Sequence, residues 1–160
     1  MGAYIVTSFA SHAKCNEDSD VVESYSSYAF GKEYRTEITE GDIKKCPRWC
    51  ENADNPPLSI RKAMRIANGR REKLVHDTEL YKWRLESVTL EFFWYDKVPY
   101  EIPYWRVHYE AHGVHGGTGI SPELDLFVLM NGALIEPIIN VDKRLDRDFG
   151  REENKEKGSK

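Results

Sequence analysis

The amino-acid sequence predicts an α+β domain in which one amphipathic helix packs on an antiparallel β-meander of three to five strands. Apolar residues recur at helical spacing over residues 59–75, and apolar and polar residues alternate in runs between residues 83 and 139. The last run turns at Asn131-Gly132, which is a strong hairpin signal. A helix with an apolar stripe and a sheet with an apolar face bury those surfaces against each other.

The composition is typical of a globular domain. The chain has 160 residues, of which 40% are hydrophobic and 31% charged, and its net charge is −4. This length suits one domain, and the negative net charge disfavours a nucleic-acid partner. No apolar run is long enough for a transmembrane segment. We expect residues 21–141 to form a single α+β domain and the charged residues 142–160 to form a disordered tail.

Residues 1–20 form a flexible N-terminal segment in this prediction. Residues 4–9 are a short apolar run, and residues 11–13 have the small-x-small form of a signal-peptidase site, but no Lys or Arg precedes the run. One interpretation is a shortened start that keeps the end of a secretory signal, which makes the protein periplasmic or secreted. The other is an edge strand or a loose arm, which leaves the protein cytoplasmic.

Three cysteines allow two kinds of cross-link. In an exported protein the favoured disulfide joins Cys46 and Cys50 through a short loop, and Cys15 is then the odd thiol. Cys15 can instead pair with either of the others. A further alternative uses His12, Cys15, Cys46 and Cys50 as ligands of a structural zinc ion.

The elements before the sheet are a strand, a connector and the helix. Residues 34–39 alternate and are rich in β-formers, and residues 41–57 form a long connector with three prolines. Ser59 is a good N-cap that follows Pro-Pro, whereas Gly69 weakens the helix by roughly 1 kcal/mol. The predicted apolar face contains Ile60, Ala63, Met64, Ala67, Arg71, Leu74 and Val75. The outer face is basic and either meets an acidic partner or membrane surface or is simply solvated; it contains Arg61, Lys62, Arg65, Arg70, Arg71 and Lys73.

The predicted strands have one apolar and one polar face. The first run places Val88, Leu90, Phe92 and Trp94 on one side. The second alternates Trp105, Val107, Tyr109 and Ala111 with Arg106, His108, Glu110 and His112. Residues 124–130 form a third strand and residues 133–139 return as a fourth. This alternation is typical of an antiparallel sheet with one solvated face.

Two segments resemble a known family. Residues 57–67 (Pro-Leu-Ser-Ile-Arg-Lys-Ala-Met-Arg-Ile-Ala) are similar to the opening helix of PepSY-type domains, and residues 126–137 to their closing hairpin. The chain departs from a minimal PepSY unit in its N-terminal aromatic strand and its cysteine-bearing connector. The resemblance implies a PepSY-like or cystatin-like fold in a small exported bacterial protein. It also implies a non-catalytic role in binding or restraining other proteins, notably proteases, and it supplies no catalytic residues.

The polar strand face and the glycine-rich loop after it form the candidate binding surface. Its predicted residues are Arg106, His108, Glu110, His112, His115 and Thr118. The loop at residues 113–119 has no helix after it and no Lys-Ser/Thr ending, which disfavours a phosphate cradle. A loop of this kind is a good place for partner contact.

A metal site is the chemical alternative on the same strand. Glu110, His112 and His115 can approach one ion if Gly113 lets the chain curl back. Two histidines and one carboxylate leave a position for water, which is the arrangement of a zinc hydrolase. His108 is about 13 Å from His112 along a regular strand, too far to share that ion.

Three functions follow as hypotheses. The first is a non-catalytic module, requiring no cofactor, that binds another protein through residues 106–118. The second is a small metal-dependent hydrolase that uses the Glu/His/His group with zinc. The third is a structural component whose aromatic residues Phe93 and Tyr95 dock on a larger assembly.

Overall fold

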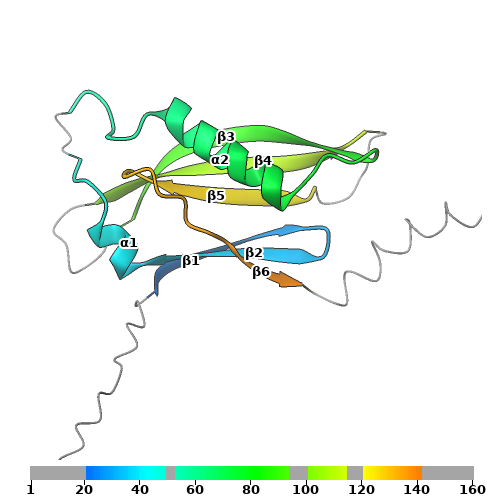
Figure 1. Cartoon of the computed structure of the whole chain (residues 1–160), viewed down its shortest axis with the longest axis horizontal. Helices are drawn as coiled ribbons and strands as arrows, with labels where there is room; N and C mark the ends of the chain where they lie inside the picture. Colours follow the sequence, from blue (N-terminus) through cyan, green and yellow to red (C-terminus); the bar gives the residue numbers. More distant parts are fainter. Residues whose placement is uncertain (1–20, 50–52, 94–100, 115–120, 142–160) are drawn as a thin grey trace, which may run out of the picture.

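The computed structural model describes residues 21–49, 53–93, 101–114 and 121–141. Within these residues the chain forms two antiparallel sheets, and α2 lies across one of them (Figure 1). The elements in chain order are β1 (Val21–Ala29), β2 (Lys32–Thr39), α1 (Glu40–Lys44), α2 (Ile60–Leu74), β3 (Tyr81–Phe93), β4 (Ile102–Gly113), β5 (Glu123–Leu129) and β6 (Ile138–Val141). Among the described residues, neither helix combines the length and apolarity needed to cross a membrane.

The predicted α+β class is confirmed, and the structure adds a second sheet that the prediction did not contain. Strands β3, β4 and β5 form the expected meander, whereas β1, β2 and β6 form a second sheet in the order β1-β2-β6. Both the first and the last strand of the described chain therefore belong to the second sheet. The PepSY-like or cystatin-like assignment stays a prediction.

Helix α2 confirms the predicted amphipathic helix and packs through small residues. Ala63 and Ala67 are fully buried, which lets the helix backbone approach the sheet closely. The indole nitrogen of Trp105 on β4 donates to the carbonyl oxygen of Leu58 at 2.8 Å, just before the helix begins. Ile60 belongs to the predicted apolar face, but it is 42% exposed because the contact stripe begins one turn later.

The connector after β2 contains a short helix that the sequence pattern did not predict. At its start the Asp42 amide donates to the Thr39 hydroxyl at 3.2 Å, and the Thr39 amide donates to the Asp42 carboxylate at 3.1 Å. This reciprocal pair is a capping box with Asp in place of Glu, which satisfies two amide groups that the helix leaves free. Ile43 is buried and anchors α1 to the core.

Strand β5 separates two hydrophobic cores because both of its faces are covered. Its α2 side belongs to a core with the helix, whereas Phe127 and Leu129 face the second sheet and pack with Ile38 of β2. The ring of Tyr25 on β1 stacks on Phe127 with centroids 4.5 Å apart. This double coverage explains why residues 124–129 form a nearly continuous apolar run rather than an alternating one.

The turn after β5 is confirmed, but the predicted fourth strand is wrong in its second half. The Gly132 amide donates to the Leu129 carbonyl at 2.8 Å, and Gly132 has a φ of 87°. This is a three-residue loop with glycine in the left-handed position, not a two-residue turn.

Residues 133–135 pair briefly with β5, and Pro137, which has no amide to donate, follows. The chain then crosses to β2, where β6 pairs.

Candidate binding surface

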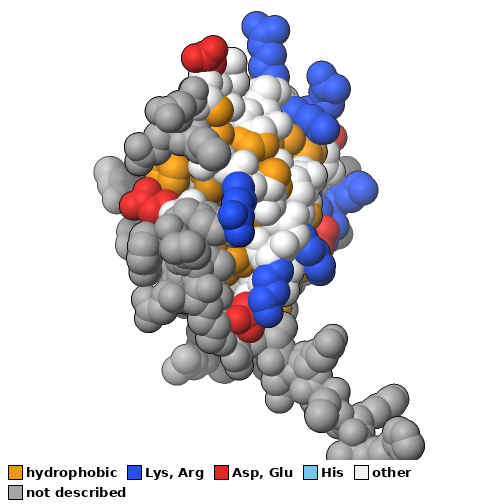
Figure 2. All heavy atoms as spheres, turned by 90° about the vertical axis from the view of Figure 1, so that its left-hand side faces the viewer, with side chains coloured by type: hydrophobic (Ala, Val, Ile, Leu, Met, Phe, Trp, Pro, Cys, Tyr) orange, Lys and Arg blue, Asp and Glu red, His pale blue; other side chains and the backbone are white. Residues whose placement is uncertain are grey.

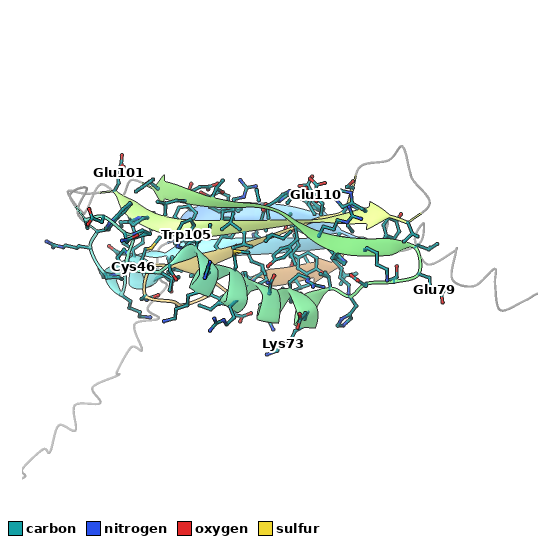
Figure 3. The ribbon with its side chains drawn as sticks, turned by 90° about the horizontal axis from the view of Figure 1, so that it is seen from above. Cys46, Lys73, Glu79, Glu101, Trp105 and Glu110 are labelled. Atoms are coloured by element: carbon teal, nitrogen blue, oxygen red, sulfur yellow. The ribbon has the colours of Figure 1, made fainter. Side chains whose placement is uncertain are left out.

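The polar side chains of β4 lie on the sheet face opposite α2. Figure 3 shows Glu110 and Lys73 of α2 on opposite sides of the sheet. The second sheet covers the β5 part of this face, so that Asp125 is 6% exposed, and it leaves the polar side chains of β4 partly exposed and most of β3 exposed. We call the charged side chains here the charged ladder; its members are Glu86, Glu91, Arg106, His108, Glu110, His112 and Asp125.

Asp125 is the buried centre of the ladder. The Arg106 guanidinium donates to it twice, from Nε to Oδ1 at 3.0 Å and from Nη2 to Oδ2 at 2.8 Å. The backbone amide of Asp125 also donates to the hydroxyl of Ser27 on β1 at 3.1 Å. Hydrogen bonding to Asp125 raises the pKa of Arg106 above its ordinary value. The two-point contact therefore holds a charged guanidinium in one orientation.

His108 lies between two carboxylates. Its Nδ1 lies 2.9 Å from Asp125 Oδ1 and its Nε2 lies 3.3 Å from Glu110 Oε1. Burial lowers the pKa of His108, but the hydrogen bonds to Asp125 and Glu110 outweigh burial and raise it above its ordinary value. Both ring nitrogens face acceptors, an arrangement that only the doubly protonated imidazolium satisfies.

The outer end of the ladder is more exposed. His112 Nε2 lies 2.8 Å from Glu86 Oε1 and 3.9 Å from Glu110 Oε2. These three side chains are between 31% and 39% exposed. Exposed ion pairs add little to stability, so these charges contribute mainly to the chemical character of the surface.

The inner end of the ladder meets the aromatic side chains between the sheets. The Tyr104 hydroxyl donates to Glu91 at 2.9 Å, and the hydroxyl groups of Tyr25 and Tyr104 lie 2.6 Å apart. Burial raises the pKa of Tyr25 to about 12. Arg106 Nη1 lies 3.5 Å from Glu91 and joins this end to the centre of the ladder.

The structure brings four of the six predicted surface residues to one face: Arg106, His108, Glu110 and His112. His115 and Thr118 lie outside the described residues. The predicted Glu/His/His metal group depends on His115 and stays a prediction. In the described ranges, no group of three or more His, Cys, Asp or Glu side chains is arranged to hold a metal ion.

The predicted polar face is less solvated than expected, and the sequence interpretation missed its centre. The alternation predicts a solvated face, but the β1–β2 sheet covers its β5 part. Asp125 is absent from the predicted surface, although it is the one charged residue between Leu124 and Met130. A lone carboxylate in an apolar strand is a usable signal, because a buried charge requires a partner.

Two other predictions concern the connector and the helix. Cys46 is half-buried with its thiol 3.5 Å from the Asp42 carbonyl oxygen, and burial raises the pKa of this thiol. Cys15, Cys50 and His12 lie outside the described residues, so the disulfide and the structural zinc site stay predictions.

On the basic helix face, Arg70 pairs with Glu136 at 2.6 Å, while Lys73 stays exposed.

No family model, no curated protein and no solved structure matches the chain. The resemblance to PepSY-type domains therefore rests on the two sequence segments alone.

Proposed function

We propose that the protein is a non-catalytic module that binds another protein through the open part of the charged ladder. The surface consists of Arg106, Glu110 and His112 on β4 with Glu86 on β3 beside them. Export from the cytoplasm belongs to the same proposal and is supported by the resemblance to PepSY-type domains.

The observation that carries this proposal is the fixed orientation of half-exposed charges. The Arg106 side chain is 35% exposed, yet two hydrogen bonds to the buried Asp125 hold it in place. A group that is already ordered loses little conformational entropy when a partner docks on it. Fixed charges of both signs also favour one partner and one register over others.

The internal pairing favours binding over catalysis. A general base or a nucleophile needs a free lone pair directed at a substrate. On this face His108 has both nitrogens next to carboxylates, and the Thr89 hydroxyl donates to Glu91 at 3.3 Å. These groups satisfy one another's hydrogen bonds, which suits recognition more than bond cleavage.

Site-specific photocrosslinking tests the surface. A photoreactive amino acid at position 112 is expected to give a discrete protein adduct in the cells that produce the protein. The same residue at position 73, which is exposed on α2, serves as the matched control. Glu110→Ala is expected to reduce the adduct at position 112 because it removes the carboxylate between the two histidines.

An adduct that forms at position 73 but not at position 112 would overturn the proposed surface. Adduct formation that is unchanged by Glu110→Ala would show that the ladder charges do not recognise the partner. Unfolding curves of each variant separate a lost contact from a lost fold.

A further inference from the structure

The chain contains two Asn-Gly dipeptides, and the fold gives them different surroundings. The first is Asn68-Gly69, inside α2, and the second is Asn131-Gly132, in the turn after β5. Asparagine before glycine is especially prone to deamidation, because glycine has no side chain to hinder attack by its backbone nitrogen on the asparagine side chain. A difference in reactivity between the two sites therefore comes from the fold.

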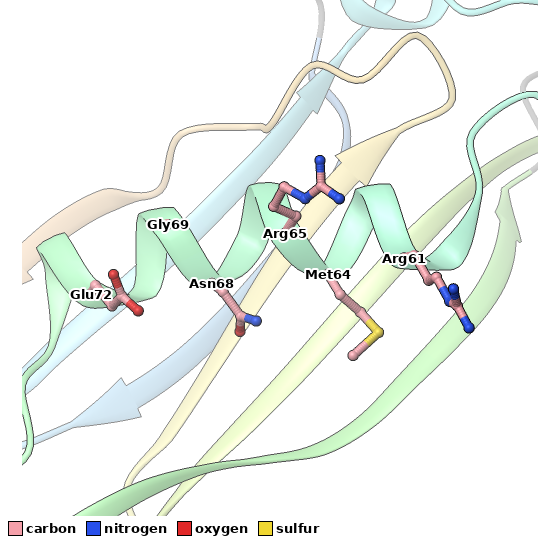
Figure 4. Close-up of a pocket in the computed structure, with 6 residues that line it drawn as sticks. All are labelled: Arg61, Met64, Arg65, Asn68, Gly69 and Glu72. Carbon is pink, nitrogen blue, oxygen red and sulfur yellow. The ribbon is translucent and has the colours of Figure 1, made fainter.

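The helix protects Asn68 from this reaction. The nitrogen of Gly69 lies inside a regular helix, and ring closure requires the backbone there to leave its helical conformation. The side chain is also held, because its Oδ1 accepts a hydrogen bond from the Tyr109 hydroxyl at 2.6 Å. Figure 4 shows Asn68 projecting from α2 toward the strands. Deamidation at this site therefore requires α2 to open locally.

Asn131 is exposed, and the turn brings its reacting groups together. Its Oδ1 accepts a hydrogen bond from the Ala133 amide at 2.8 Å, which bends the side chain over the intervening peptide. Negative charge develops on this oxygen when the Gly132 nitrogen attacks, and the Ala133 amide is in place to stabilise it. One contact opposes the attack, because the Gly132 amide donates to the Leu129 carbonyl at 2.8 Å. Breaking this single hydrogen bond frees the attacking nitrogen.

The surface around the turn also favours the reaction. Figure 2 shows this end of the molecule, where Lys and Arg side chains project into solvent. Lys45, whose side chain is exposed, contacts the turn directly, because Asn131 Nδ2 donates to its carbonyl oxygen at 3.3 Å. Positive charge near the turn stabilises the deprotonated Gly132 nitrogen and the anionic oxygen that forms after it attacks.

We propose that Asn131 is a site of spontaneous deamidation and that the reaction releases the turn after β5 from α1. In the first step the Gly132 nitrogen forms a bond to the side-chain carbonyl carbon of Asn131. The bond from that carbon to Nδ2 breaks, and Nδ2 leaves as ammonia with the proton that the Gly132 nitrogen gives up. Water then opens the succinimide ring at either carbonyl, which gives aspartate or isoaspartate at position 131.

Both products lose the contact between the turn and α1. Neither has the Nδ2 donor, and aspartate places a carboxylate oxygen against the Lys45 carbonyl oxygen instead. Isoaspartate also lengthens the backbone of the turn. Cys46 is next to this contact, and backbone groups of Met130 and Asn131 hydrogen-bond to its thiol. The reactivity of the Cys46 thiol therefore reports the release.

Peptide mapping of the aged protein tests the site. The full chain is held at mildly alkaline pH, and mass spectrometry follows the peptides that contain Asn68 and Asn131. In the folded protein, deamidation is expected to be more than about tenfold faster at Asn131 than at Asn68, because only Asn68 is protected by a helix. In urea, where both dipeptides are unfolded, the two rates are expected to be similar.

Two results would overturn the proposed site. One is an equal rate at the two asparagines in the folded protein. The other is an Asn131 peptide that stays unmodified over a time in which the unfolded chain is fully converted. Asn131→Gln is the matched control for ageing, because its amide is retained but its side chain is too long to form a succinimide.

Alkylation of Cys46 tests the release of the turn. In a variant with Cys15→Ser and Cys50→Ser, conversion of Asn131 is expected to raise the alkylation rate severalfold, and Asn131→Asp is expected to raise it as well. Asn140→Asp, the same charge change on β6, is expected to leave the rate unchanged. An alkylation rate that is the same before and after conversion of Asn131 would show that the turn stays attached to α1, which would overturn the proposed release.

Discussion

At the scale of single residues, Asp125 determines how the ladder responds to substitution. Its side chain is 7% exposed and accepts hydrogen bonds from Arg106 and His108. Losing these hydrogen bonds costs the buried carboxylate more than it costs the donors. The donors can still bind water, whereas the carboxylate is left without partners. Removing one donor therefore costs more than removing the whole pair.

The first prediction follows from this asymmetry. Arg106→Ala is expected to lower the free energy of unfolding by about 2–3 kcal/mol, because it leaves Asp125 short of two hydrogen bonds. The double variant Arg106→Ala with Asp125→Ala is expected to lose less than the sum of the losses of Arg106→Ala and Asp125→Ala. Urea unfolding of the four proteins measures the coupling. Strictly additive losses would show that the two side chains do not interact in solution.

The second prediction concerns the pH dependence of stability. The pKa of His108 is raised in the folded protein, so protonation favours the folded state. Its contribution is complete below the unfolded pKa of about 6.5 and is lost as the pH rises through the higher folded pKa. The free energy of unfolding is therefore expected to fall as the pH rises through this range. His108→Gln is expected to remove the part of the fall that comes from His108, whereas His76→Gln, at an exposed position, is expected to leave it unchanged. Unfolding curves between about pH 5.5 and 8.5 measure the effect, and equal slopes for the wild type and His108→Gln would contradict it.

At the scale of elements, the substitution Gly→Ala is expected to change stability in opposite directions at two positions. In α2 an added Cβ at Gly69 has no atom within 4 Å, whereas Gly132 in the turn has a φ of 87°. Gly69→Ala is expected to stabilise the protein by about 0.5–1 kcal/mol through helix propensity. Gly132→Ala is expected to destabilise it by about 1–2 kcal/mol through backbone strain. Urea midpoints test both signs, and a destabilised Gly69→Ala would show that the glycine has a structural role.

The elements that the sequence predicts correctly are those whose pattern is local. The period of two over residues 105–111 places Arg106, His108 and Glu110 on one face, and the structure has them there. The spacing in α2 is likewise local. The contact between His108 and Asp125 is different, because it depends on the register between β4 and β5, which no local pattern determines.

The pairing of β6 illustrates the same limit over a longer distance. The sequence predicts a strand that continues the hairpin, but Tyr34 of β2 pairs with Ile139 across more than a hundred residues. One edge of β5 pairs with β4, and the other is engaged at one end by residues 133–135 and at the other end by Ser27 of β1. Which segment pairs with β5, and which must pair elsewhere, is therefore decided by contacts between distant parts of the chain and not by the local sequence.

At the scale of the whole molecule, the two sheets depend on each other. The second sheet is built from β1, β2 and β6. In the sequence, α2 and all three strands of the first sheet lie between β2 and β6. Each core also contains side chains from both sheets: Tyr34 lies in the helix-side core, and Ile38, from the same strand, packs with Phe127. Neither sheet can bury its apolar face without the other.

The last prediction is that residues 21–141 unfold as one cooperative unit. Trp83 and Trp105 are buried in the helix-side core, and Cys46 packs against the core between the sheets. In a variant with Cys15→Ser and Cys50→Ser, tryptophan fluorescence and the reactivity of the Cys46 thiol are expected to give the same urea midpoint. Phe127→Ala is expected to lower both midpoints together, with a loss of about 3–5 kcal/mol, because it opens a cavity between the sheets. Separate midpoints would show that each sheet is stable alone, and the ladder would then lie on a surface that can open between two independent units.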